Sequence, residues 1–252
     1  FYRQSFRPLI EAIASGRIRG VAADVGCNNP GLTQDKAHMD VISALLKNDV
    51  LVVSTGCGAL AAGKYGYLTG EAGLDKVGPG LREICETIGI PPVLHMGSCV
   101  DNSRILTVLS QMATEGGLGD DISDIPAVGL APEWMSEKAL VIATYCVASG
   151  AYVIFGGSSP VSGMPDRVSD SDLVLKFISE GWEKLYGGKL EFIPDPQEMI
   201  RKTLEHIDKK RAALGLPEWE QDKFGRSGDA KMNELEALPL EKKREAIYGV
   251  VG

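Results

Sequence analysis

The sequence predicts a three-layer α/β fold built on a doubly wound, mostly parallel sheet. Short apolar segments alternate along the chain with segments of helical periodicity, and most positions of the apolar segments are hydrophobic. Strands of this kind are buried on both faces, so helices should cover both sides of the sheet. Right-handed crossovers between parallel strands then give the doubly wound arrangement.

The first elements set the pattern of helix followed by strand. A helix is predicted over 5–15 and an apolar strand over 18–25, which stops at a glycine. Thr33 is the predicted N-cap of a helix over 33–46, in which apolar residues recur at helical spacing. A buried strand follows at 50–54.

The middle of the chain repeats this unit. Helices are predicted over 81–87 and 103–113, and strands over 92–96 and 127–130, from their apolar periodicity and their Gly, Pro and Ser boundaries. Ser136 is the predicted N-cap of the next helix.

The last elements complete the alternation. They are a strand at 152–155, a helix at 170–185, a strand at 190–193 and a helix at 196–213. The sequence therefore predicts a Rossmann-like domain over 1–215. A polar C-terminal extension over 216–252 either wraps over a partner or forms a loosely ordered tail.

Composition excludes several classes of protein. The chain has 252 residues, 44% of them hydrophobic, which is enough for a packed core. Its 26 Lys and Arg against 34 Asp and Glu give a net charge of −8, which argues against nucleic acid as a partner. No apolar run approaches the roughly 20 residues of a membrane span, and no signal peptide is recognisable, so a cytoplasmic protein is expected. The first residue, Phe1, is not Met, which suggests a fragment or a processed product.

Three of the five cysteines fall just beyond predicted strands. Glycine precedes Cys27 and Cys57 directly and stands two residues before Cys99. The carboxyl ends of parallel strands meet along one edge, so these thiols should converge there. The sequence has no C-x-x-C pair of the zinc-ribbon type, and an odd number of cysteines disfavours a disulfide framework. Soft thiolates select iron–sulfur, zinc or nickel, so a metal site is predicted at Cys27, Cys57 and Cys99.

The remaining cysteines and the histidines are weaker candidates. A single free cysteine is usually a small buried apolar residue, and Cys85 and Cys146, both in apolar helices, are assigned to core packing. His38 and His206 lie on predicted helices, where a partly exposed or structural role is expected. His95 precedes the Cys99 loop and is a candidate to support a ligand.

Lys138 falls in the first turn of a predicted helix that is otherwise mostly apolar. A lysine there opposes the helix dipole, so a residue chosen for stability would be acidic. Two interpretations remain open at this point: a functional cation, or a solvated surface lysine.

Four motifs together resemble a known family. They are DVGCNNP (24–30), STGCGALAAGKYG (54–66), HMGSCVDNSR (95–104) and PEWMSEKAL (132–140). In this order they resemble the C-terminal third of the catalytic subunit of anaerobic nickel–iron–sulfur carbon monoxide dehydrogenases, over about residues 18–214.

The resemblance implies a redox enzyme that interconverts CO and water with CO2, protons and electrons at a nickel–iron–sulfur cluster (Ni-4Fe-4S/5S). By motif, Cys27 and Cys57 are iron ligands and Cys99 is the nickel ligand. Lys138 corresponds to a lysine that hydrogen-bonds an oxygen of bound CO2, and Ile142 to an apolar residue packed over the open nickel position.

The resemblance also implies parts that this chain lacks. In the family a further histidine, two further cysteines, proton-transfer histidines and 4Fe-4S clusters lie upstream, so the chain alone should be inactive. A homodimer and a ferredoxin-type electron carrier are implied, and the extension resembles forms that associate with acetyl-CoA synthase. Two alternatives stay open: a hybrid-cluster protein, which reduces hydroxylamine at an iron–sulfur–oxygen centre, and a non-catalytic docking module.

Overall fold

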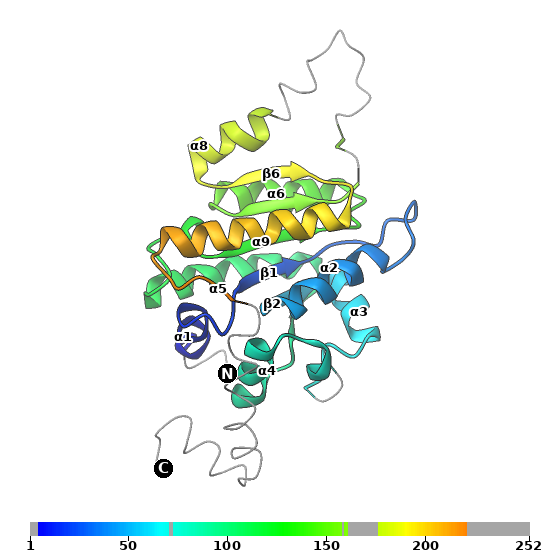
Figure 1. Ribbon diagram of the computed structural model, residues 1–252. Coiled ribbons are helices and arrows are strands. Elements are labelled where there is room, and N and C mark those ends of the chain that lie inside the picture. Colours follow the sequence, from blue (N-terminus) through cyan, green and yellow to red (C-terminus); the bar gives the residue numbers. More distant parts are fainter. Residues whose placement is uncertain (1–4, 71–72, 158, 161–175, 221–252) are drawn as a thin grey trace, which may run out of the picture.

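The structure, a computed structural model, describes residues 5–70, 73–157, 159–160 and 176–220. Six strands form one sheet in the order β3-β2-β1-β4-β5-β6, and all five neighbouring pairs are parallel (Figure 1). The strands are β1 (Gly20–Asp24), β2 (Val50–Thr55), β3 (Val93–Gly97), β4 (Ala127–Ala131), β5 (Tyr152–Phe155) and β6 (Lys189–Phe192). The predicted α/β class with a mostly parallel sheet is confirmed.

Helices cover both faces of this sheet. The described helices are α1 (Arg7–Ala14), α2 (Lys36–Lys47), α3 (Gly56–Lys64), α4 (Pro79–Ile88), α5 (Asn102–Glu115), α6 (Glu137–Ala148), α8 (Trp182–Tyr186) and α9 (Pro196–Ala213). Short turns of helix are η1 (Leu74–Lys76), η2 (Cys99–Asp101), η3 (Ile122–Asp124) and the π-helical η4 (Phe177–Gly181). Helices α2 and α9 pack together on one face, while α5 and α6 lie behind the sheet (Figure 1).

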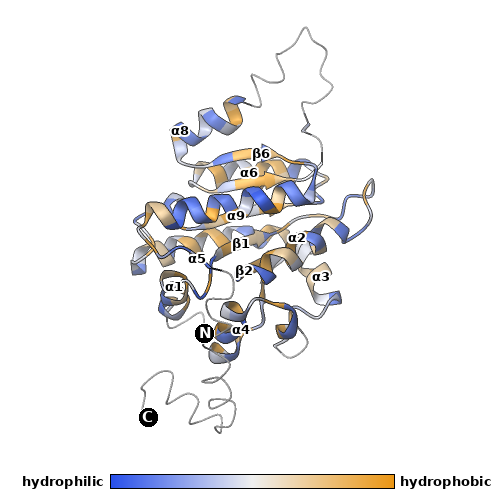
Figure 2. Cartoon of the chain, viewed as in Figure 1, coloured by the Kyte–Doolittle hydropathy of each residue, from blue (hydrophilic) through white to orange (hydrophobic). Residues whose placement is uncertain are grey.

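Apolar burial holds these layers together. Every residue of β2 is buried, and on α2 the side chains of Ile42, Leu45 and Leu46 are fully buried against it. Figure 2 shows apolar strands between helices whose outward sides are polar, as on α9. Each fully buried Leu or Ile contributes about 1.5–3 kcal/mol to stability, so this sandwich fixes the positions of the strand ends.

The strand order places a topological switch point between β1 and β4. The helix that follows β1 covers one face of the sheet, whereas the helix that follows β4 covers the other. The two connections diverge from neighbouring strands, which leaves a crevice at their carboxyl ends. Ligands of open α/β sheets bind at such a crevice, so it is the first place to look for a functional site.

Three details differ from the sequence-based expectation. Thr33 is not an N-cap, because α2 begins at Lys36 after Asp35, whose φ of 65° is left-handed. Helix α3 was not expected at all. The helix predicted over 170–185 appears as η4 followed by α8, and its beginning lies outside the described residues.

The division at residue 216 stays a prediction, because only residues 216–220 of the extension are described. The indole of Trp219 lies over the Arg19 guanidinium, 4.2 Å from its carbon, and its Nε1 donates to Asp49 Oδ2 at 3.3 Å. The start of the extension therefore contacts the domain. Among the described helices, none is both long and apolar enough to cross a membrane.

Candidate metal centre

The three strand-end cysteines border one cavity. Cys27 follows β1, Cys57 lies in the first turn of α3 after β2, and Cys99 begins η2 after β3. All three line a cavity of about 330 Å³, as does Lys138. Among the described residues, no group of three or more His, Cys, Asp or Glu side chains is arranged to hold a single metal ion. The thiols border a shared space.

Cys99 packs directly against the loop that carries Cys57. Gly56 has a φ of 60°, and a Cβ at this position would collide with Cys99 Sγ. The Cys57 N–H donates to the Gly26 carbonyl at 3.0 Å, which joins this loop to the Cys27 loop as well. The ends of β1, β2 and β3 are thus linked through backbone and sulfur contacts.

A buried ion-pairing group supports the Cys27 loop. His38 on α2 has its Nε2 2.8 Å from the Cys27 carbonyl and its Nδ1 2.8 Å from Asp24 Oδ2, and neither His38 nor Asp24 is exposed. A carbonyl only accepts hydrogen bonds, so Nε2 carries a proton. One further proton lies between Nδ1 and Oδ2, and the pair as a whole is neutral.

Electrostatics within the pair follow from its burial. Desolvation alone would lower the pKa of His38, but the adjacent Asp24 carboxylate outweighs it and raises that pKa to about 9. Desolvation also raises the pKa of Asp24, against the opposing effect of His38. Asp24 Oδ1 is buried and accepts no hydrogen bond from any described residue.

Glu133, which is fully buried, joins the loop before α6 to the start of α2. Its carboxylate accepts hydrogen bonds from Asn28 Nδ2 (3.0 Å) and from the backbone N–H groups of Asp35 (3.2 Å), Ala37 (2.9 Å) and His38 (3.4 Å). A carboxylate at a helix N-terminus satisfies unpaired N–H groups and interacts favourably with the helix dipole. One side chain therefore fixes both α2 and the Cys27 loop.

The Cys99 turn is held locally. Ser98 and Asp101 form a capping box around η2, with the Ser98 N–H 2.8 Å from Asp101 Oδ2. Burial raises the pKa of the Cys99 thiol and the neighbouring Cys27 and Cys57 raise it further, whereas Lys138 acts in the opposite direction. The three sulfurs and the ammonium are thus close enough to influence one another.

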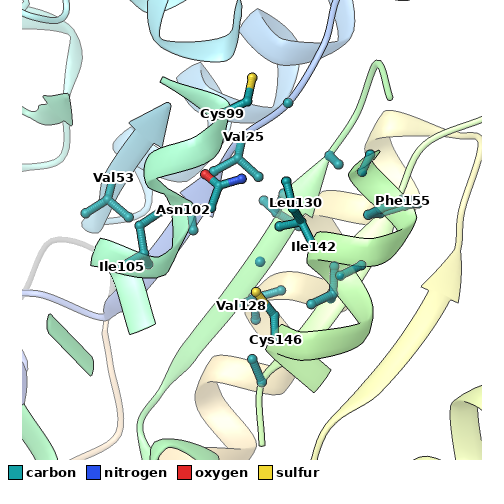
Figure 3. A pocket seen from close by; sticks show the side chains of 18 of the residues that line it. Val25, Val53, Cys99, Asn102, Ile105, Val128, Leu130, Ile142, Cys146 and Phe155 are labelled. Carbon is teal, nitrogen blue, oxygen red and sulfur yellow. The ribbon is translucent and has the colours of Figure 1, made fainter. Parts of the chain in front are cut away.

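Lys138 lies in the first turn of α6 and is exposed. No hydrogen bond or ion pair holds its ammonium group among the residues that the structure describes. Ile142, one turn later, lines the same cavity. The cavity continues along the sheet between α5 and α6, with Cys99 at one end and Cys146 toward the other, and its walls are almost entirely apolar (Figure 3).

The other cysteines and histidines occupy different surroundings. Cys85 is buried in the core on α4, and burial raises its pKa to about 12. Cys146 packs against the apolar cluster beneath α6 as expected, but it also faces the cavity, and burial raises its pKa to about 12 as well. His206 stacks on Tyr152, with ring centroids 4.7 Å apart, and His95 is exposed on β3.

Sequence reasoning missed Asp24 and Glu133. Asp24 is an acid at the end of an apolar strand, and Glu133 follows a proline at the end of another. An acidic residue at the end of an apolar strand could have indicated a buried polar contact, because a buried carboxylate requires a hydrogen-bonding or charged partner. His38 was expected to be partly exposed or structural, and its complete burial agrees with the structural role.

The chain is similar to known proteins in both sequence and structure. The model of the Prismane/CO dehydrogenase family matches residues 2–197. The chain belongs to this family. Carbon monoxide dehydrogenase 1 of Methanosarcina mazei is 47% identical over 209 residues, which cover 83% of this chain and 32% of that protein. The carbon monoxide dehydrogenase of Rhodospirillum rubrum is 39% identical, over 83% of this chain and 33% of its own.

Solved structures of carbon monoxide dehydrogenases contain a region with the same fold as this chain. An as-isolated, nickel-free carbon monoxide dehydrogenase from Thermococcus sp. AM4 aligns with a TM-score of 0.77 and 46% identity, over 84% of this chain and 32% of that one. A structure of acetyl-CoA synthase/carbon monoxide dehydrogenase described with nickel-containing [Fe4S4] clusters in its alpha subunits aligns with a TM-score of 0.76 and 37% identity, over 91% of this chain and 32% of that one. The chain thus spans about a third of the relatives that it matches. Because these relatives are carbon monoxide dehydrogenases, the hybrid-cluster alternative is not favoured.

Proposed function

We propose that this chain is the cluster-binding, Rossmann-like part of a carbon monoxide dehydrogenase, corresponding to the C-terminal third of the catalytic subunit. The observation that carries the proposal is the convergence of three thiols, from the ends of three neighbouring strands, on one cavity. The wall of this cavity also carries a lysine that has no ion pair among the described residues. Membership of the Prismane/CO dehydrogenase family supports it.

The residues present fit a nickel–iron–sulfur cluster. Thiolates are the ligands that iron–sulfur and nickel centres prefer. Three thiolates close together repel one another, and positively charged metal ions would stabilise them. The close approach of Cys99 to Gly56 leaves no room for a side chain at the base of the site. In this proposal Cys27 and Cys57 bind iron and Cys99 binds nickel, and a histidine and two cysteines from the rest of the subunit complete the ligand set.

When bound, the cluster supplies the two-electron chemistry that interconverts CO and water with CO2. Lys138 provides a positive charge on the cavity wall for negative charge that develops on the substrate oxygens. Ile142 lies one turn further along α6, where its apolar side chain keeps water from the same space. Lys138 thus makes one side of the site electrophilic, and Ile142 keeps the other side free of water.

The apolar cavity between α5 and α6 suits a small, uncharged substrate. Its lining offers almost no polar group to retain water, so CO loses little by entering it. We assign this cavity as an access route for CO from the far end of the sheet toward the cysteines.

The remaining features of the proposal concern the whole enzyme. It would act as a homodimer in the cytoplasm, pass electrons to a ferredoxin-type carrier and hold 4Fe-4S clusters in its other domains. One relative is named carbon monoxide dehydrogenase/acetyl-CoA synthase subunit beta, which supports acetyl-CoA synthase as a partner. It is 41% identical over 83% of this chain.

The test is metal analysis and CO oxidation with the intact protein, prepared without oxygen. We expect about one nickel per subunit together with iron, and CO-dependent reduction of a viologen dye. Cys99→Ala should keep the fold, as judged by circular dichroism, but lose nickel and activity. Cys85→Ala, a core cysteine outside the site, should lose stability by roughly 1 kcal/mol or more and keep its metals. An iron-containing, nickel-free protein that reduces hydroxylamine would contradict the proposal, as would full CO oxidation by Cys99→Ala.

A further inference from the structure

The buried pair of His38 and Asp24 has a role that packing does not explain. We propose that His38, held in orientation by Asp24, is a positioning residue for Cys27: its Nε2–H fixes the Cys27 carbonyl and thereby the direction of the thiol. The inference deepens the proposed function, because the role of Cys27 as a ligand rests on that function.

The backbone of Cys27 needs such support because it has left the sheet. The last ladder bond of this segment runs from the Val25 N–H to the Leu130 carbonyl, at 2.8 Å. Beyond it, the Gly26 carbonyl accepts from Cys57 N–H and the Cys27 carbonyl accepts from His38. These two hydrogen bonds hold successive peptide units, so together they restrict rotation of the segment that carries the thiol.

Stability alone would not select this pair. Burying an imidazole and a carboxylate costs free energy, and apolar residues of similar volume are often neutral or stabilising in such places. Both side chains are fully buried here, and Asp24 Oδ1 has no hydrogen-bond partner in the part of the chain that the structure describes. Because the buried pair costs free energy, a role in orienting the Cys27 backbone explains it better than a role in stability.

The geometry confines the effect to one cysteine. Cys57 lies within the first turn of α3 and its N–H is held by the Gly26 carbonyl, not by the Cys27 carbonyl that His38 contacts, and Cys99 is held by the capping box of Ser98 and Asp101. Cys27 alone depends on a side chain from a different element. A change at His38 should therefore affect Cys27 and leave the other two thiols as they are.

The experiment compares three substitutions of His38 in the intact protein. His38→Gln keeps an N–H donor that reaches toward Cys27, His38→Asn keeps a polar group facing Asp24 but falls short of Cys27, and His38→Leu removes both contacts. His206→Leu is the matched control, since it removes a partly buried histidine of α9 that stacks on Tyr152.

The first readout is alkylation of each cysteine in metal-depleted protein, followed by peptide mass spectrometry. In His38→Leu and His38→Asn, we expect alkylation of Cys27 to rise relative to Cys57 and Cys99 by roughly fivefold or more, the factor that loss of one hydrogen bond implies. His38→Gln should stay close to the unaltered protein, and so should His206→Leu. The second readout is iron and nickel per subunit, which should fall in His38→Leu and His38→Asn and be largely restored in His38→Gln.

The results separate the two proposals. An equal change at all three cysteines, no change at Cys27, or His38→Asn behaving like His38→Gln would overturn the positioning role. If the unaltered protein binds no nickel while Cys27 alone responds to His38, the proposed function fails and the positioning of Cys27 stands. If nickel binds and the alkylation pattern is unchanged, the positioning role fails and the proposed function stands.

Discussion

Lys138 is a cation placed where a helix disfavours one. It lies in the first turn of α6, against the helix dipole, and no acidic side chain within the described residues pairs with it. The sequence left a functional cation and a surface lysine equally open. Its place on the cavity wall and its influence on the Cys99 thiol favour the functional interpretation.

Replacing this lysine should slow turnover and spare the metals. We expect Lys138→Ala to lower kcat for CO oxidation by roughly 10²-fold or more, the effect of removing one preorganised charge from an active site. Iron and nickel per subunit should be unchanged. Lys36→Ala, which removes an exposed lysine paired with Asp40, is the control and should keep full activity. An unaltered kcat in Lys138→Ala would remove this residue from the site.

Gly56 offers a second test at the scale of single residues. Ala at this position meets both a left-handed backbone, with φ of 60°, and the sulfur of Cys99. Gly215 has a similar φ of 66° but open space around it. Gly56→Ala and Gly215→Ala should each destabilise the fold by about 1–2 kcal/mol through the backbone. Only Gly56→Ala should also lose nickel, measured by elemental analysis. Equal metal content in the two variants would show that the Cys99 contact is unimportant.

Among the elements, α2 shows how a distant side chain can define where a helix starts. Asp35, the N-cap residue, makes no side-chain capping bond, and the unpaired N–H groups of the first turn are satisfied by Glu133 from the loop before α6. The same carboxylate accepts from Asn28 in the Cys27 loop. The start of α2 is therefore part of the support of the site.

Glu133→Gln should destabilise the fold although the two side chains have almost the same shape. An amide NH2 group would face N–H donors, leave some of them unsatisfied and remove a charge that interacts well with the helix dipole. We expect the free energy of unfolding to fall by about 1–3 kcal/mol in denaturant titrations. Glu137→Gln, at an exposed position in the first turn of α6, should stay within about 0.5 kcal/mol. A loss no greater than that of Glu137→Gln would contradict the capping role.

The comparison of elements also shows what sequence can and cannot predict. The strands were predictable because their apolar runs end at glycines and polar residues, and this placed the three cysteines at strand ends. Helix α3 was not, because its GCGALAAGK sequence contains three glycines, each about 1 kcal/mol less favourable in a helix than Ala. The structure explains two of them: a Cβ at Gly56 would collide with Cys99 Sγ, and a Cβ at Gly58 would come within 2.6 Å of Asp24 Oδ2.

Contacts between residues far apart in the chain also could not be predicted from the sequence. Thr33 looked like a cap because capping is usually local, whereas α2 is capped by Glu133, 96 residues beyond Ala37. His38 reads as an ordinary helical residue until Asp24 and Cys27 are brought against it. Contacts of this kind depend on the packing of whole layers, which no local pattern encodes.

At the scale of the whole molecule, the apolar cavity is the space that two helices leave uncovered on one face of the sheet. It is bounded by α5, α6 and the side chains of the central strands (Figure 3). Cys146 lines it away from the other thiols, and its raised pKa keeps it a neutral thiol. It is therefore a suitable place to block the cavity without touching a ligand.

Cys146→Phe should obstruct the proposed route for CO. The added ring projects into a cavity of about 330 Å³, so we expect kcat/KM for CO to fall several-fold while metal content is unchanged. Cys146→Ala should keep both activity and metals, because the thiol is not a ligand. Thr144→Phe, on the exposed side of the same helix, controls for added bulk. Unchanged kcat/KM in Cys146→Phe would place the access route elsewhere.

The strand order has a consequence for how such a site can diverge. The three sulfurs come from β1, β2 and β3, which lie on one side of the switch point, while Lys138 follows β4 on the other. In the proposed enzyme, mutations after β1, β2 and β3 would change the metal ligands, and mutations after β4 would change the group that polarises the substrate, while Glu133 and Asn28 join the two sides. A scaffold partitioned in this way is able to exchange one chemistry for another in separate steps.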